Sequence, residues 1–375
     1  MRRVLIMASL FWPQKYSGGP TVSLFNLVNV LKDNFDIYVI SKNHELNQKN
    51  KLPGIGKGWN KFDFGKAYYT DFGKHSYKEI SKLIEEVKPD TIYQNSFFSA
   101  DDLIPVLDYK KKNPNVKIIV VPRGEFYPER LKVGWLKKKL YITIFKITGM
   151  LNKIYFQGTG VEECLQIEKI LGVPQENIYD IQNLSIIKKE NIKIRKNKGE
   201  LRLVYIARIH PTKNLLKAIE YLHKVKGNVI YDIFGSIEDK EYWKQCENRI
   251  NELPDNIKVK YKGPLNHELV SQTLLKYHAY YMPTTGENFG HSIVEAMLVG
   301  RIVVISDQTP WTEVNKYGGY AIPFIDSIKY IKILNDLCYM SQEVFDKNCK
   351  EVNRFINDRL NIRETIEKYI NLFGE

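Results

Sequence analysis

The chain has 375 residues, of which 43% are hydrophobic and 26% are charged. This is the composition of an ordinary globular protein, and it excludes disordered, collagen-like and mini-protein classes. At roughly 100–200 residues per domain, the length predicts two domains. The cysteines, Cys164, Cys246, Cys338 and Cys349, lie far apart and form no CxxC pair. Their spacing indicates neither a zinc knuckle nor a disulfide framework, and it fits a reducing compartment.

The N-terminal apolar run, residues 4–12, has two possible interpretations. It follows Arg2 and Arg3, as a short signal peptide would, and it also has the length of a buried first strand. The run has no small-residue cleavage site and ends at Pro13 and Gln14, which favours the strand. No apolar run approaches the ~18 residues that a spanning helix needs. We therefore expect a cytoplasmic protein.

The net charge of +13 is confined to the first half of the chain. Residues 1–198 carry 33 basic and 20 acidic residues, whereas residues 199–375 carry 23 of each. Two domains with different partners explain such a partition better than one domain does. The basic half is expected to meet an acidic partner, which is nucleic acid, anionic lipid or a phosphorylated substrate.

Short apolar strands alternate with helices along the first half. A Gly-rich turn at residues 17–20 separates the first strand from the first helix. The expected strands are residues 3–8, 36–40, 91–93, 116–121 and 154–156, and the expected helices end near residue 31, span 74–88 and begin near 161. This alternation predicts a doubly wound parallel sheet.

A lysine-rich segment, residues 186–199, interrupts the alternation. It is interpreted as a linker, although an exposed charged hairpin within one domain would look similar. Strands are expected again at residues 201–207, 229–234, 257–261, 279–282 and 302–305, and residues 344–373 are helical and charged. The prediction is an N-terminal Rossmann-like domain (1–185), a linker (186–199), a C-terminal domain (200–355) and a last helix (356–375). Ligands of such sheets bind beyond the carboxyl ends of the strands, so a site is expected in a cleft between the two domains.

Residues 283–296 carry the most informative motif. A loop follows a strand there, and a helix is expected to begin near Phe289 with its unpaired amides forming an anion site suited to a diphosphate. Glu287 precedes this helix, and Glu295 follows eight residues later. Carboxylates accept hydrogen bonds from sugar hydroxyls, so one would contact the reacting sugar and the other a more distant ribose. A solvated helix with incidental glutamates is the alternative.

Two cations follow the expected strand 201–207. Arg208 and Lys213 suit a diphosphate leaving group, whose negative charge grows as the sugar bond breaks. Alone, they would be interpreted as surface charges. Gly235 ends the next strand, 229–234, at a point where a ligand could approach the backbone.

These motifs together resemble the donor domain of retaining family-four glycosyltransferases of the GT-B fold. The residues that carry the resemblance are Arg208, Lys213, Phe234-Gly235, Glu287, Glu295, Gly300 and Val304-Ile305-Ser306-Asp307. Gly18-Gly19 is similar to the glycine loop at the N-terminus of that family. The sequence of residues 286–291 and that of residues 306–311 resemble those of enzymes that build bacterial surface polysaccharides.

The resemblance implies a role for each charged motif residue. Arg208 and Lys213 would bind the donor diphosphate, Glu287 would contact the transferred sugar, and Glu295 would hold the ribose. The first two, with Glu287 and Arg123, would form the catalytic group. The last helix is expected to return to the N-terminal domain, as it does in the family.

Backbone groups complete the implied donor site. Asn288, Phe289 and Gly290 would present amides to sugar and phosphate. Gly18 and Gly19 would line the cleft near the phosphates.

Arg123 is a departure from the family pattern, because many members carry a histidine at this place. Arginine cannot act as a base at neutral pH. Arg123 is interpreted as holding the departing phosphate or an acidic group of the acceptor. The structural alternative is a salt bridge to Glu125 or Glu129.

No metal or cofactor is expected. The chain contains no Asp-x-Asp pair, and Arg208, Lys213 and the helix end would replace the cation of metal-dependent transferases. The co-substrate would be a nucleotide-diphosphate sugar. The resemblance implies retention by front-face attack, through a transition state with oxocarbenium character.

Residues 130–153 contain seven basic and no acidic side chains, interleaved with apolar ones. The predicted membrane or acceptor residues are Arg130, Lys132, Trp135, Lys137, Lys138 and Lys139. A basic amphipathic helix of this kind suits an anionic bilayer surface. The alternative is a helix with one face on the core and solvated lysines. Nucleic acid is not expected as a partner, because no recognition motif is present.

The function predicted from the sequence is transfer of a sugar from a nucleotide sugar to a glycan acceptor. The acceptor is expected to be linked to a polyprenyl diphosphate, in surface-polysaccharide biosynthesis, with the protein peripheral on the inner face of the cell membrane. Two alternatives stay open. One is a UDP-sugar epimerase of the same fold, and the other is a non-catalytic homologue that recruits a partner to the membrane.

Overall fold

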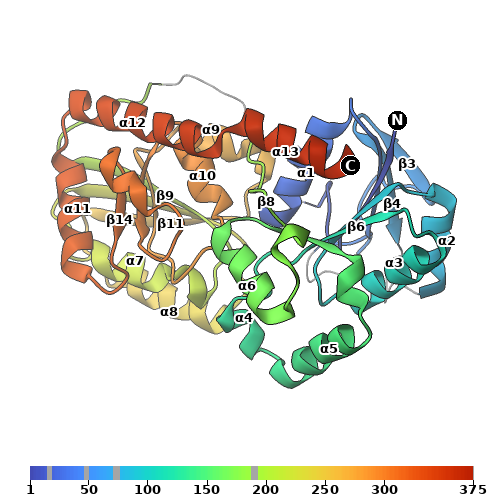
Figure 1. The fold of residues 1–375 in the computed structure, drawn as a ribbon. Coiled ribbons are helices and arrows are strands. Elements are labelled where there is room, and N and C mark those ends of the chain that lie inside the picture. Colours follow the sequence, from blue (N-terminus) through green and yellow to red (C-terminus); the bar gives the residue numbers. More distant parts are fainter. Residues whose placement is uncertain (15–18, 46–49, 71–76, 187–192, 375) are drawn as a thin grey trace. The chain divides into compact units, whose positions relative to one another are not determined.

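The computed structural model describes residues 1–14, 19–45, 50–70, 77–186 and 193–374. It divides into two compact units, each drawn in Figure 1 with its sheet and helices. The first unit comprises Met1–Leu184 together with Ile362–Glu375, and the second unit comprises Ser185–Asn361. The end of the chain therefore returns to the unit in which it began.

The described part of the segment interpreted as a linker belongs to the second unit. Lys196 is buried there, and its Nζ donates to the backbone oxygen of Cys338 at 2.8 Å. Its backbone amide donates to Oε1 of Gln342 at 2.7 Å. Residues 187–192 lie outside the described part of the chain.

The first unit is built on an eight-stranded sheet in its described residues. All neighbouring strands are parallel except β3, which runs antiparallel to β4. The strands, in spatial order, are β3 (Trp59–Phe62), β4 (Gly65–Thr70), β2 (Asp36–Lys42), β1 (Arg3–Met7), β5 (Thr91–Asn95), β6 (Lys117–Val121), β7 (Tyr155–Gly158) and β8 (Ile178–Asp180). The β3–β4 hairpin and β8 were not predicted from the sequence.

Helices cover both faces of this sheet, and a separate apolar core fills each face. The helical segments are α1 (Gly19–Leu31), α2 (Tyr77–Val87), α3 (Ala100–Lys112), α4 (Pro128–Lys132), α5 (Trp135–Ile147), η1 (Met150–Lys153), α6 (Val161–Leu171), η2 (Gln175–Asn177) and α13 (Ile362–Gly374). Tyr369, Leu372 and Phe373 attach α13 to the face that α1 covers. The ring of Phe373 contacts that of Tyr93 with centroids 5.2 Å apart.

The second unit is built on a six-stranded parallel sheet in its described residues. The strands, in spatial order, are β11 (Ile257–Gly263), β10 (Asn228–Phe234), β9 (Glu200–Ile206), β12 (Ala279–Met282), β13 (Ile302–Ser306) and β14 (Tyr320–Ile322). Its helical segments are η3 (Pro211–Lys213), α7 (Leu215–Leu222), α8 (Lys240–Asn251), η4 (His267–Leu269), α9 (Val270–Leu274), α10 (His291–Leu298), η5 (Thr312–Lys316), α11 (Ser327–Tyr339) and α12 (Gln342–Leu360).

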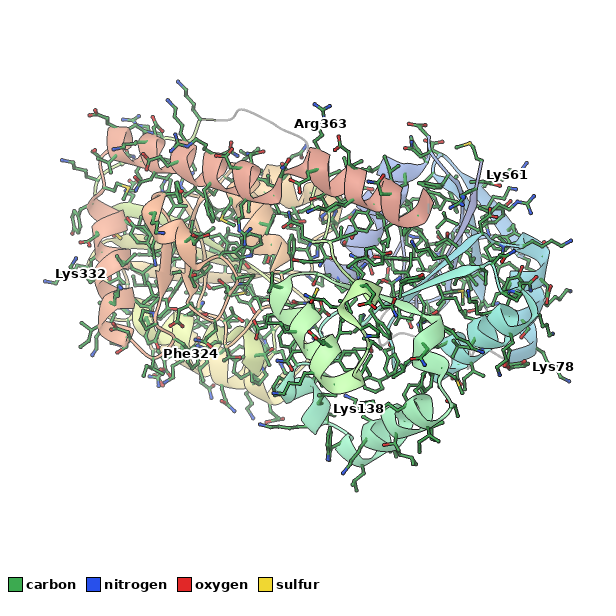
Figure 2. The ribbon with its side chains drawn as sticks, viewed as in Figure 1. Lys61, Lys78, Lys138, Phe324, Lys332 and Arg363 are labelled. Atoms are coloured by element: carbon green, nitrogen blue, oxygen red, sulfur yellow. The ribbon has the colours of Figure 1, made fainter. Side chains whose placement is uncertain are left out.

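Strand composition explains strand position in this sheet. Inner strand β13 reads Ile-Val-Val-Ile-Ser and is buried throughout, as expected for a parallel strand covered on both faces. Strand β11 lies at the edge and alternates apolar residues with Lys258, Lys260 and Lys262. Edge lysines discourage pairing with a further strand. Other lysines, such as Lys61, Lys78 and Lys332, are exposed and extend from the surface (Figure 2).

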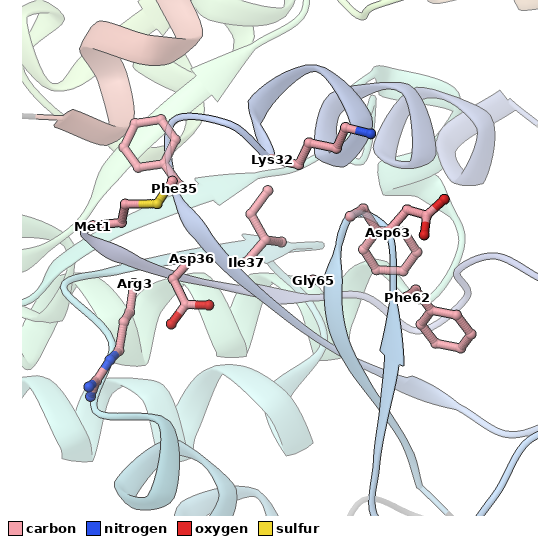
Figure 3. A pocket seen from close by; sticks show the side chains of 10 residues that line it. Met1, Arg3, Lys32, Phe35, Asp36, Ile37, Phe62, Asp63 and Gly65 are labelled. Atoms are coloured by element: carbon pink, nitrogen blue, oxygen red, sulfur yellow. The ribbon is translucent and has the colours of Figure 1, made fainter.

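A hollow of about 540 Å³ lies in the first unit, at the amino ends of β1, β2 and β4 (Figure 3). Arg3, Asp36 and Gly65, which begin those strands, line it together with Lys32 and Asp63. Ligands of doubly wound sheets bind at the opposite, carboxyl ends of the strands. The candidate site is therefore expected at the carboxyl ends.

Candidate active site

The loop after β12, residues 283–290, is held on one side by the loop after β9. Strands β9 and β12 are parallel neighbours, so their carboxyl ends meet. The backbone oxygen of Thr212 accepts hydrogen bonds from Oγ1 of Thr284 at 2.9 Å and from the amide of Thr285 at 2.9 Å. Nδ2 of Asn214 donates to the backbone oxygen of Pro283 at 2.8 Å.

The loop after β13 holds the same segment from the other side. Oγ of Ser306 donates to the backbone oxygen of Thr284 at 2.6 Å. The backbone amide of Glu287 donates to the backbone oxygen of Gln308 at 3.0 Å. Nε1 of Trp311 donates to the backbone oxygen of Phe289 at 2.5 Å. A segment fixed on both sides is a rigid mount for a reacting side chain.

Lys213 and Glu287 form an ion pair in this mount. Nζ of Lys213 lies 2.5 Å from Oε1 of Glu287, and the two side chains are 16% and 11% exposed. Mostly buried charges are screened less than surface charges, so removing one member leaves the other poorly compensated. The structure thus brings together two residues that the sequence assigned separately to phosphate and sugar.

Arg208 forms a second ion pair, with Glu238. Its Nη1 lies 2.5 Å from Oε1 of that residue. Arg208 follows β9 and Glu238 follows β10, and these strands are parallel neighbours. Glu238 was missed in the sequence. It could have been identified as an acidic residue three positions after Gly235, in the loop that follows β10.

Gly235 is required by the protein's own backbone. Its φ is +152°, and a Cβ at this position would lie 1.8 Å from the backbone oxygen of Ala207. The predicted reason for the glycine was the approach of a ligand. Contact between the ends of β9 and β10 already excludes any side chain here, so the glycine by itself is no sign of a ligand.

Helix α10 begins at His291, two residues later than predicted. Gly290 precedes it with φ +73°, a left-handed conformation that favours glycine. Asn288, Phe289 and Gly290 therefore form the loop before the helix, and the role of their amides stays a prediction. Glu295 is the fifth residue of α10.

Glu295 is buried and paired with a histidine. The residue is 3% exposed, and its Oε1 lies 2.8 Å from Nε2 of His267. Burial lowers the pKa of His267, but the hydrogen bond and charge of Glu295, with the charge of Glu268, outweigh burial, so its pKa is raised. His267 was also missed, because no pattern in the sequence relates its loop to α10.

Arg123, in the first unit, is bound by neutral oxygens. Its Nε donates to Oδ1 of Asn95 at 3.2 Å, its Nη1 donates to Oδ1 of Asn183, and its Nη2 donates to the hydroxyl of Tyr93 at 3.5 Å. Its φ of +53° is unusual for a residue other than glycine. The guanidinium is thus held at the carboxyl end of β6 without a carboxylate among these partners.

The structural alternative for Arg123, a salt bridge to Glu125, is wrong. Glu125 accepts instead from Oγ of Ser96 at 2.5 Å and from the amide of Phe97 at 2.7 Å, so it fixes the turn after β5. The side chain of Glu129 is not among those described.

The hydrogen bonds of Arg123 continue to the last helix. The Tyr93 hydroxyl donates to Oε1 of Gln157 at 2.8 Å, and Nε2 of Gln157 donates to the hydroxyl of Tyr369 at 2.8 Å. Tyr369 lies on α13. Helix α13 is therefore connected to Arg123 through the hydrogen bonds of Tyr369, Gln157 and Tyr93.

The N-terminal glycines are only partly described. Gly18 lies outside the described residues, and Gly19 is the first residue of α1. Their predicted place near the phosphates stays a prediction. Among the residues that the structure describes, no group of three or more His, Cys, Asp or Glu side chains could hold a metal ion.

Helix α5 carries an apolar stripe on its outer face. We use this name for Leu136, Leu140, Ile144 and Ile147, which are exposed and follow one another at helical spacing. Leu136 and Ile147 are each 80% exposed. Lys137, Lys139 and Lys146 are exposed beside the stripe.

The opposite face of α5 attaches the helix to the first unit. Ile142 and Phe145 are buried, and Tyr141 contacts Phe145 with ring centroids 4.6 Å apart. Lys138 (labelled in Figure 2) was predicted to face the membrane, but its Nζ lies 5.2 Å from the centroid of the Phe98 ring and donates to the backbone oxygen of Arg130 at 2.6 Å. The alternative, a helix with one face on the core and solvated lysines, agrees with the buried Ile142 and Phe145 and with the exposed lysines, but it does not account for the apolar stripe.

The remaining predicted membrane residues are exposed as well. Arg130, Lys132 and Trp135 lie on α4 or at the start of α5, and all are at least partly open to solvent. No described helix is both long and apolar enough to cross a bilayer.

Comparison with known proteins finds a family model that matches part of the chain and solved structures that share its fold. The family model described as "Glycosyl transferases group 1" matches residues 187–348. No curated protein matches the chain. Solved structures match over nearly the whole chain, at identities that show the fold alone.

Three of these structures illustrate the match. HepE from Anabaena, in complex with UDP and glucose, is 15% identical with a TM-score of 0.72, covering 100% of both chains. A glycosyltransferase from Rickettsia africae is 12% identical with a TM-score of 0.73, covering 99% of this chain and 97% of that one. WaaG, a glycosyltransferase involved in lipopolysaccharide biosynthesis, is 12% identical with a TM-score of 0.67, covering 99% of each. The predicted fold class is confirmed.

Proposed function

We infer that the chain transfers a sugar from a nucleotide-diphosphate sugar to a glycan acceptor, because residues 187–348 match the model of group 1 glycosyl transferases. The observation that carries this proposal is the Lys213–Glu287 pair on a loop fixed from both sides. It combines a cation for phosphate with a carboxylate for sugar hydroxyls. The similarity to WaaG supports a glycan of the surface-polysaccharide class.

The chemistry assigned to the second unit is charge stabilisation. As the bond from sugar to diphosphate breaks, negative charge grows on the leaving phosphate, and Lys213 and Arg208 are the cations available to it. Each is paired with a carboxylate in the structure described above, so the donor phosphates compete with Glu287 and Glu238 for them. Glu287 then becomes free to accept hydrogen bonds from the transferred sugar.

The donor is proposed to be a UDP-sugar, because HepE was solved with UDP and glucose. Transfer is proposed to retain the anomeric configuration and to need no metal, in keeping with the family resemblance. Product configuration can be read from the anomeric proton coupling in NMR spectra. EDTA separates metal-independent transfer from metal-dependent transfer.

The acceptor is proposed to be lipid-linked, at an anionic membrane surface. The apolar stripe on α5 supports this, because a soluble protein gains nothing by exposing four large aliphatic side chains in a row. Full burial of such a side chain contributes about 1.5–3 kcal/mol. Lysines beside an anionic bilayer add about 1 kcal/mol each. The stripe and its flanking lysines therefore act together.

Arg123 is proposed to bind the anionic part of the acceptor. Its partners are neutral, so its positive charge is available to a diphosphate. Replacement by lysine would keep the charge but lose the fork of donors that fits a phosphate. Arg123→Lys is therefore expected to raise the KM for a diphosphate-linked acceptor more than the KM for the donor.

A thermal-shift screen of the full chain against UDP-, GDP- and ADP-sugars tests the proposed function. A donor at 100 times its Kd stabilises the native state by about 2.7 kcal/mol. A shift with one class of donor is expected. No shift with any nucleotide sugar would overturn the proposal.

A further inference from the structure

Glu295 is a buried carboxylate. It is 3% exposed, and the adjacent residues of α10, Val294, Ala296 and Met297, are buried as well. A carboxylate in such a place stays ionised only when it is paired or hydrogen-bonded. Something must therefore hold this side chain before any ligand arrives.

His267 is the group that holds it. The ring lies on η4, 28 residues before Glu295, and its Nε2 lies 2.8 Å from Oε1 of the carboxylate. Among the described residues, His267 is the side chain that hydrogen-bonds Glu295, and none donates to Oε2. One oxygen is thus occupied by the protein, and the other is left to a ligand.

We propose that His267 is a positioning residue for the donor nucleotide, holding Glu295 so that Oε2 accepts hydrogen bonds from the adjacent hydroxyls of a ribose. This inference rests on the proposed function, transfer from a nucleotide sugar, and on the ribose contact that the family resemblance implies for Glu295. The ligand class follows from the chemistry, because an ionised carboxylate oxygen accepts and cannot donate. A ribonucleotide offers two donors there, and a 2′-deoxyribonucleotide offers one.

The charge of His267 also acts on an anionic ligand. The Glu295 carboxylate on α10 contacts its ring, and both this charge and that of Glu268, the next residue in the chain, favour the protonated ring. The pKa of His267 is raised above its ordinary value of 6.5. The ring is therefore charged at pH values below 6.5, and it loses its charge as the pH rises through the raised pKa. Above it, Glu295 adds an uncompensated negative charge near the nucleotide, so affinity falls.

Calorimetry on the full chain tests this. UDP, GDP and ADP are titrated into the wild type, and the tightest binder and its 2′-deoxy analogue are then titrated into His267→Ala and His267→Gln. His267→Ala is expected to weaken ribonucleotide binding about tenfold, the usual effect of losing a charged hydrogen bond. It is also expected to lose most of the preference for ribose over deoxyribose.

Two variants separate positioning from general damage. The glutamine amide in His267→Gln still donates to Glu295, so affinity and ribose preference are expected to stay within about threefold of the wild type. The fall of affinity with rising pH is expected to disappear, because glutamine does not titrate. His223→Gln, at an exposed histidine in the same unit, is the matched control and is expected to change nothing.

The outcomes distinguish the inference from the proposed function. Wild-type affinity in His267→Ala, or equal losses in His267→Ala and His267→Gln, would overturn the positioning role. If Glu295→Ala weakens binding while His267→Ala does not, the proposed function survives and the inference fails alone. If the wild type binds none of the three nucleotides, the proposed function fails and the inference fails with it.

Discussion

Helices α10 and α5 depart from the usual burial of side chains in opposite directions. Helix α10 buries a carboxylate, Glu295, and supplies it with a histidine partner. Helix α5 exposes the apolar stripe, although its other face already supplies the apolar contacts that attach it to the first unit. Neither departure helps folding, because one desolvates a charge and the other leaves hydrocarbon in water.

The difference teaches which kind of partner each unit is built for. A buried, oriented carboxylate suits a small polar ligand that must be held in one geometry. An exposed apolar stripe bordered by lysines suits an extended surface that needs no fixed geometry. Ligand binding by the second unit therefore depends on the positions of single atoms. Membrane binding by the first unit depends on the total apolar area and charge of the surface. Single substitutions should break the former, whereas several are needed to break the latter.

The largest effect is expected from Glu287→Ala. Loss of the carboxylate removes its contact with the transferred sugar, and it frees Lys213 for the diphosphate, so nucleotide binding should hold or tighten. Transfer is expected to fall by more than about 10³-fold. Measured together, kcat and the Kd for nucleoside diphosphate decide the point. Glu313→Ala, at an exposed glutamate, is the control; equal losses of binding and turnover in the Glu287 variant would contradict the assignment.

Arg208→Ala and Lys213→Ala come next. Each removes a cation placed for the leaving phosphate, and each is expected to slow transfer by about 10²–10³-fold. Lys217→Ala, on an exposed lysine of the same unit, should leave the rate unchanged. Wild-type activity should also persist in EDTA, and a strict requirement for Mg²⁺ or Mn²⁺ would mean that these cations do not carry the phosphate charge.

The apolar stripe is tested by the triple variant Leu136→Ser, Leu140→Ser and Ile144→Ser. At about 1.5–3 kcal/mol per fully buried side chain, even partial insertion of three predicts more than about a hundredfold loss of binding to anionic vesicles. Sedimentation with vesicles measures it. Activity on a soluble acceptor should survive.

The flanking lysines sharpen the same comparison. Replacing Lys137, Lys139 and Lys146 by glutamine is expected to weaken vesicle binding by a comparable factor at low salt, and less as salt shortens the Debye length. Lys138→Gln should have less effect, because its ammonium already contacts Phe98. If the serine triple keeps vesicle binding while the lysine triple loses it, insertion is wrong and attraction is purely electrostatic.

The smallest effect is expected from Glu295→Gln. The glutamine keeps its shape and one acceptor oxygen, so the donor KM should rise about tenfold with little change in kcat. Steady-state kinetics with the donor varied give both numbers. An unchanged donor KM would show that α10 buries Glu295 for a reason unrelated to ribose.

Much of the fold followed from local pattern. Runs such as Ile-Val-Val-Ile-Ser in β13 are typical of buried parallel strands, and the loops after them could be placed at one edge of a sheet. The Arg208–Glu238 pair was within reach, since β9 and β10 follow one another and end together. The β3–β4 hairpin was not predicted because its strands mix lysine, asparagine and glycine with apolar residues and carry no regular alternation.

The rest depended on tertiary contact. Both faces of α5 are apolar, so the sequence alone does not say which one packs on the core or where Lys138 points. The partner of Glu295 lies on another loop, 28 residues away, and no periodicity connects the two. Arg123 offered two plausible carboxylates nearby, yet Glu125 is used to fix a turn instead.

A transfer assay with labelled nucleotide sugar and lipid-linked glycan acceptor in anionic vesicles tests the central claim most directly. The account predicts that label moves into the lipid-linked product, with one nucleoside diphosphate released per sugar transferred. Donor consumed without an acquired label on the acceptor would indicate an epimerase. Donor bound but not consumed would indicate a non-catalytic homologue, and either result would contradict the account.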